Sequence, residues 1–101
     1  MKLLLITAIT EFENDMKNIL VKSGAKSFTY HTVQGFKNEK TSNALENWFA
    51  SSYSETESLL FTVFVSAENS VQILEKIREF NGKQETLSKI HIALVALEQQ
   101  F

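Results

Sequence analysis

Apolar residues along the chain gather in stretches whose spacing is alternately that of strands and that of helices. Residues 3–9 form a nearly continuous apolar run, which predicts a central strand. The stretch from Thr10 to Glu13 has the form of a capping box, in which the Thr10 hydroxyl accepts a hydrogen bond from the Glu13 backbone N–H. We expect a helix to start there and to end near Ser23, before Gly24. Its apolar stripe consists of Phe12, Met16, Ile19 and Leu20.

The rest of the chain repeats this alternation. Residues 27–36 are rich in β-branched and aromatic side chains and predict a second strand. Residues 58–65 predict a third, buried strand, after which Ser66 is placed to cap a second helix. A fourth strand is expected over residues 89–97. The second helix should end at Asn81 and Gly82, and its stripe comprises Ile73, Leu74, Ile77 and Phe80, with Val71 one turn earlier.

A long polar and serine-rich segment, residues 37–57, separates the second and third strands. It contains Leu45, Trp48 and Phe49 at helical spacing, which predicts a short amphipathic helix inside a long loop. These side chains form either a small lid on the protein's own body or an anchor for a partner protein.

The order of elements, β-α-β-loop-β-α-β, predicts an α+β fold of the ferredoxin-like kind in one domain, residues 1–101. In that fold two helices cover one face of a four-stranded antiparallel sheet. Apolar residues occupy both odd and even positions in three of the expected strands, residues 3–9, 58–65 and 89–97. The uncovered face is therefore expected to be apolar as well. We therefore expect copies of the chain to bury this face in a homo-oligomer.

Composition narrows the classes of function. The chain has 101 residues and a formal net charge of −2, which supplies no basic field for nucleic acid. Cysteine is absent, which excludes disulfides and thiolate metal sites and fits a reducing compartment. The apolar start is too short for a signal peptide, and no run reaches the length of a membrane span. We expect a soluble, cytoplasmic protein without membrane insertion.

The sequence offers no Gly-rich phosphate loop, no Ser/His/Asp arrangement and no close carboxylate pair, so we expect no enzymatic activity. His31 and His91 are the two histidines, each on an expected strand. They would ligate a metal if the strands met across a cleft or a subunit interface, although a third ligand is not evident. The alternative is that both are ordinary strand histidines.

Residues 19–36 read Ile-Leu-Val-Lys-Ser-Gly-Ala-Lys-Ser-Phe-Thr-Tyr-His-Thr-Val-Gln-Gly-Phe. This stretch resembles the first helix end and second strand of the PII nitrogen-regulatory signalling proteins, and the order of elements and the long loop also match. The resemblance implies a homotrimer that binds adenine nucleotides such as ATP, ADP or AMP in clefts between subunits. It also implies that the long loop engages a partner protein, such as a membrane transporter or a regulator. The matching positions are Gly24, Thr29, Val33, Gly35 and Phe36.

The same resemblance implies which residues line the nucleotide cleft and which contact the partner. Two inner glycines of the family's second nucleotide segment are missing here, and so are its C-terminal arginines. Glycine lets backbone N–H groups approach a phosphate closely, so we expect weakened or altered nucleotide binding, with solvated loop lysines as the alternative. The implied nucleotide residues are Thr29, Gly35, Lys40, Gly82, Lys83 and Lys89, and those of the partner-binding loop are Leu45, Trp48, Phe49 and Tyr53.

Two other readings stay open. Trimeric CutA-type proteins, linked to metal tolerance, share this architecture, so a CutA-like or metal-efflux-associated protein that binds metal through His31 or His91 is the first alternative. A ligand-binding or enzymatic module of the dimeric barrel type is the second, and a dimer mass would distinguish it.

Overall fold

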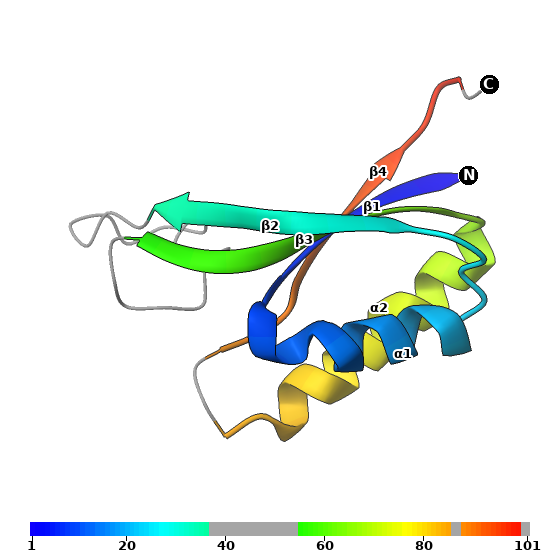
Figure 1. Cartoon of the computed structure of the whole chain (residues 1–101). Helices are drawn as coiled ribbons and strands as arrows, with labels where there is room; N and C mark the ends of the chain where they lie inside the picture. Colours follow the sequence, from blue (N-terminus) through cyan, green and yellow to red (C-terminus); the bar gives the residue numbers. More distant parts are fainter. Residues whose placement is uncertain (37–54, 86–87, 100–101) are drawn as a thin grey trace.

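The computed structural model describes residues 1–36, 55–85 and 88–99. The expected short helix with Leu45, Trp48 and Phe49, together with Lys40 and Tyr53, lies outside these residues. A short 3₁₀ turn, Thr10–Phe12, precedes the first helix. The elements in chain order are β1 (Lys2–Ile9), α1 (Glu13–Lys22), β2 (Thr29–Phe36), β3 (Glu55–Val65), α2 (Ala67–Lys83) and β4 (His91–Ala96) (Figure 1).

The four strands form one sheet in the order β2-β3-β1-β4, and each neighbouring pair is antiparallel. Both helices lie on the same side of this sheet (Figure 1). The predicted ferredoxin-like α+β fold is therefore confirmed. β1 is the central strand as expected, since Ile6 faces Phe61 of β3 on one side and Ile92 of β4 on the other.

The hydrophobic core lies between the sheet and the two helices. Phe61 is fully buried there, and its ring centroid lies 5.2 Å from that of Tyr30 and 6.0 Å from that of Phe28. Each helix contributes the inner part of its predicted stripe. The other fully or almost fully buried core side chains are Leu4, Ile6, Ala8, Met16, Leu20, Leu59, Val63, Val65, Ile73, Ile77 and Ile90.

The start of α1 differs from the prediction, because the capping box is not formed. Thr10 already belongs to the 3₁₀ turn, and its hydroxyl lies 3.2 Å from the Glu11 carboxylate instead of capping the backbone N–H of Glu13. A capping side chain needs an extended backbone at its own residue. Ile9 holds that extended conformation here and has no hydroxyl. The end of the helix agrees with the prediction, since α1 stops at Lys22.

α2 begins as predicted, with the Ser66 hydroxyl accepting a hydrogen bond from the Asn69 backbone N–H at 3.1 Å. The assignment of Val71 to the buried stripe is wrong, because this side chain is 59% exposed. Ser70 is buried in its place, since residues 70, 73 and 77 follow one helical stripe and 71 falls about 100° away. The helix also runs through Gly82 to Lys83, beyond the predicted end.

The strand boundaries shift by a few residues. β3 starts at Glu55, so the segment 37–57, predicted as a loop, includes the first residues of a strand. The ladder between β2 and β3 extends to the pair Phe36 and Glu55, because backbone pairing continues past the last apolar position. β4 spans His91–Ala96, which is shorter than the predicted 89–97.

Candidate functional site

The uncovered face of the sheet is the candidate functional site. Strand register and the alternation of side chains define which residues point to it. None of these side chains in the described strands carries a full charge. They are Leu3, Leu5, Thr7 and Ile9 of β1, Thr29, His31, Val33 and Gly35 of β2, Ser58, Leu60, Thr62 and Phe64 of β3, and His91, Ala93 and Val95 of β4.

One end of this face is strongly apolar. Leu3 of β1 lies between Phe64 of β3 and Val95 of β4 in the register. Phe64 is 50% exposed and Val95 is 40% exposed, although each belongs to a strand of the sheet. Exposed apolar side chains gathered on one surface mark an interaction site. The sequence predicted the apolar character of this face, because apolar residues occupy both odd and even positions of the strands. It did not single out any of these three residues.

The two histidines lie on this same face, at opposite edges of the sheet. His31 is opposite Leu60, Leu60 is opposite Thr7, and Thr7 is opposite His91. Three strand spacings separate β2 from β4, which places the two histidines about 14 Å apart. A metal ion binds imidazole nitrogen at about 2 Å, so one chain cannot hold a single ion with both.

Burial lowers the pKa of His91 below its ordinary value of 6.5. Its imidazole is therefore neutral at pH 7, which is the form that binds metals. In the part of the chain that the structure describes, no group of three or more His, Asp or Glu side chains is arranged to hold a metal ion.

Of the residues expected at a nucleotide cleft, the described part of one chain brings together only Gly82, Lys83 and Lys89, at the end of α2. Thr29 and Gly35 lie at opposite ends of β2, six residues or about 20 Å apart. Gly82 and Lys83 are in the last turn of α2, on the helical side of the sheet. The Lys89 ammonium donates to the backbone carbonyl of Asn81 at 3.0 Å.

Asn81 itself is a residue that the sequence presented only as a helix end. Its side-chain amide donates to the Ile90 carbonyl and accepts from the Ile90 N–H, both at 2.8 Å. This pair of hydrogen bonds ties the end of α2 to the segment that enters β4. Asn followed by Gly predicts a turn, and no sequence signal identified the distant partner.

Within the described residues, no helix is both long and apolar enough to cross a membrane.

Comparisons with known proteins establish the fold alone. No family model matches the sequence, and no curated protein matches it. Among solved structures, a DUF3240 family protein from Shewanella baltica OS155 is similar, with a TM-score of 0.69 and 14% sequence identity. The match covers 99% of this chain and 92% of that one.

Proposed function

We propose that this protein is a non-enzymatic, PII-like regulatory protein that assembles as a homotrimer through the uncovered face of its sheet. In this proposal the segment 37–57 binds a cytoplasmic partner surface, such as that of a membrane transporter or a regulator. Its contact residues are Leu45, Trp48, Phe49 and Tyr53. The sequence resemblance supplies the trimer and the role of the segment.

The observation that carries the proposal is that no Asp, Glu, Lys or Arg among the described strand residues points to the uncovered face. Transfer of apolar surface out of water contributes about 25 cal/mol per Å². A charged side chain on this face would oppose burial, because desolvation of an unpaired charge costs several kcal/mol. Leu3, Phe64 and Val95 meet in register at one end, where a second copy would cover them. The face is therefore suited to contact between identical copies.

Light scattering coupled to size exclusion tests the assembly. The proposal predicts a particle of three chains of 11.5 kDa each. Phe64→Glu places a charge on the uncovered face and should yield monomers at micromolar concentration. Val21→Glu is the matched control, because Val21 is 65% exposed on α1 and lies on the other side of the sheet. A monodisperse wild-type monomer would contradict the proposal, and a dimer mass would favour the dimeric-barrel alternative.

Nucleotide binding in this proposal uses a cleft between subunits, since Thr29 and Gly35 lie about 20 Å apart within one chain. Isothermal calorimetry against ATP, ADP and AMP, with and without magnesium, measures it directly. Saturable binding near one site per subunit that Lys83→Ala weakens, while Lys26→Ala does not, is the expected result. Lys26 is an exposed control in the connection between α1 and β2. Absence of binding to all three nucleotides would reject nucleotide binding. It would not contradict the proposed assembly.

The second candidate function is metal binding through His31 and His91. Two observations favour it: both imidazoles lie on the uncovered face, and burial keeps that of His91 neutral at pH 7. An arrangement that sets β2 of one copy against β4 of another would bring His31 of one copy near His91 of its neighbour. Titration with Zn²⁺, Ni²⁺ or Cu²⁺ should show binding that both His31→Ala and His91→Ala abolish. Binding unaffected by either change, or no binding, excludes this function.

A further inference from the structure

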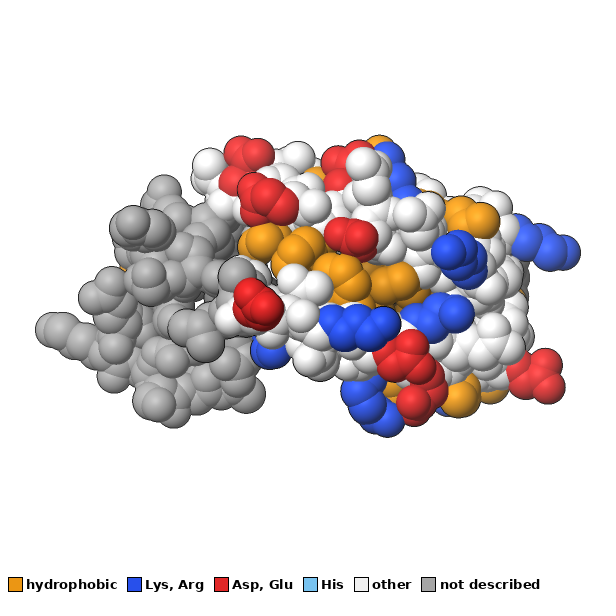
Figure 2. Space-filling view, turned by 90° about the horizontal axis from the view of Figure 1, so that it is seen from below, with side chains coloured by type: hydrophobic (Ala, Val, Ile, Leu, Met, Phe, Trp, Pro, Cys, Tyr) orange, Lys and Arg blue, Asp and Glu red, His pale blue; other side chains and the backbone are white. Residues whose placement is uncertain are grey.

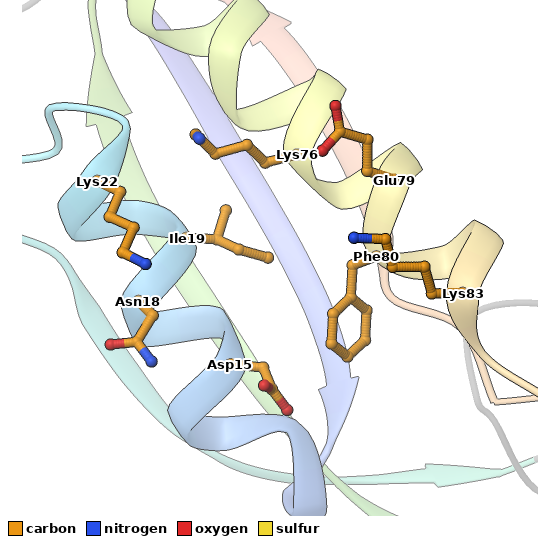
Figure 3. A pocket seen from close by; sticks show the side chains of 8 residues that line it. All are labelled: Asp15, Asn18, Ile19, Lys22, Lys76, Glu79, Phe80 and Lys83. Atoms are coloured by element: carbon orange, nitrogen blue, oxygen red, sulfur yellow. The ribbon is translucent and has the colours of Figure 1, made fainter.

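The helical side of the molecule carries a groove between α1 and α2. Its volume is about 300 Å³, and residues of both helices line it (Figure 3). In the space-filling view from the helical side, a strip of apolar side chains runs between basic and acidic groups (Figure 2). This surface lies across the sheet from the uncovered face, so an assembly through that face would leave the groove open to solvent.

The floor of the groove is apolar and held in place. Ile19 of α1 and Phe80 of α2 both line it and pack against the hydrophobic core. The Phe80 ring meets the Phe12 ring edge to face, with centroids 4.9 Å apart and an interplanar angle of 82°. Such an aromatic pair fixes the orientation of both rings. The floor is thus a preformed apolar surface for one or two inserted side chains.

The rim of the groove carries more positive than negative charge. Lys22, Lys76 and Lys83 line it against two carboxylates, Asp15 and Glu79. Figure 3 shows Lys22 of α1 and Lys76 of α2 at the Ile19 end of the groove, and Asp15 and Phe80 toward the other end. The Ile19 end therefore carries two lysines, while the Phe80 end combines an aromatic floor with Lys83 and the Asp15 carboxylate (Figure 3).

Among the described residues, none of these three lysines forms an ion pair, although Asp15 and Glu79 line the same groove. The ion pairs within the described residues join Lys17 to Glu13 at 2.7 Å and Arg78 to Glu75 at 2.8 Å. Neither pair involves a lysine of the groove. Opposite charges at i,i+3 or i,i+4 on a helix surface can pair, as these two pairs do. The rim lysines are left available for a carboxylate from outside.

We propose that this groove binds a short acidic amphipathic peptide segment of a partner protein, with a carboxylate between Lys22 and Lys76 and an apolar side chain on Phe80. Helices that bind in grooves present apolar anchors on one face and charges along its border. The elongated apolar floor favours such a segment over a compact anion, which would need charge without an apolar surface. Complementary charge would set the orientation of the segment and speed its association.

Selection from a random twelve-residue peptide library displayed on phage, against the full wild-type chain, tests this inference. The expected peptides carry Asp or Glu beside one or two large apolar residues. Synthetic copies should bind Lys22→Ala/Lys76→Ala at least about fivefold more weakly than wild type, and the difference should shrink as salt is raised. Lys2→Ala/Lys26→Ala removes the same charge away from the groove and should bind like wild type.

Several results would overturn the inference. No enrichment, an enriched pattern without acidic residues, or equal binding by both double variants each contradicts it. Complete displacement of the peptide by millimolar inorganic phosphate or ATP would show that the rim serves small anions instead. Phe64→Glu separates the two proposals, because loss of assembly should leave peptide binding at the groove unchanged.

Discussion

Asn81 connects two elements through one side chain. Its amide pairs with both backbone groups of Ile90, a residue that is 2% exposed. A buried backbone N–H and carbonyl need partners, and Ile90 precedes the first paired residue of β4. Asn81 therefore acts as an extra strand partner at the point where the chain enters the sheet.

Asn81→Ala should destabilise the fold by about 1–3 kcal/mol, because it leaves the Ile90 backbone groups buried without these partners. Asn18→Ala is the control, since Asn18 is exposed on α1, and it should change stability by no more than about 0.5 kcal/mol. Urea unfolding followed by far-UV circular dichroism measures both. Equal stability of the two variants would show that Asn81 has no such role.

Replacement of glycine by alanine should have opposite effects on stability at Gly24 and at Gly82. Gly24 has a φ of +88°, and an added Cβ would lie 2.8 Å from the Asn69 amide nitrogen. Gly24→Ala should therefore cost about 1–2 kcal/mol. Gly82 lies in helical backbone with nothing within 4 Å of an added Cβ, so Gly82→Ala should stabilise by about 0.5–1 kcal/mol. Thermal unfolding of both variants checks the signs, and a shift in the same direction would refute the argument.

At the scale of elements, β4 is an edge strand whose first residue, His91, is partly desolvated. The pKa of His91 is lower in the folded protein than in the unfolded chain. At a pH between these two pKa values, the unfolded chain therefore binds more protons at His91 than the folded protein does. The associated stability is fully present above pH 6.5 and is lost as the pH falls below 6.5, until the lowered pKa of the folded state is reached.

Unfolding free energies measured between pH 7.5 and 5.5 should accordingly decrease toward low pH. His91→Gln should flatten this dependence over the same window. His31→Gln, at the opposite edge of the sheet, should leave it in place. A slope that survives in His91→Gln, or that disappears in His31→Gln, would assign the effect to another group.

The sequence predicted the kind and order of these elements because apolar spacing reflects burial directly. Ile73 and Ile77 mark the inner side of α2, and the nearly continuous apolar run of β1 marks a central strand. The failures have local causes that spacing does not reveal. Val71 is apolar yet exposed, and Thr10 has the right side chain but the wrong backbone conformation for a cap. The partner of Asn81 is separated by nine residues and depends on tertiary structure.

At the scale of the whole molecule, the sheet separates two surfaces of different chemistry. The apolar character of the uncovered face was predictable, since apolar residues occupy both odd and even positions of the strands, and no Asp, Glu, Lys or Arg of the described strands points to it. The groove was not predictable from either helix alone, because Lys22 and Lys76 lie on different helices and approach each other only when the helices pack side by side. Lysines that border an apolar stripe are the sequence signal that a search for such a groove would use.

The placement of both helices on one side of the sheet has a consequence for affinity. If three sheet faces pack together, three grooves point outward from one particle, at separations fixed by the fold. A partner that carries two acidic segments would then bind the second groove at a high effective concentration. Avidity would make a weak single contact selective for the assembled protein, and dissociation into monomers would release the partner without any change in the groove.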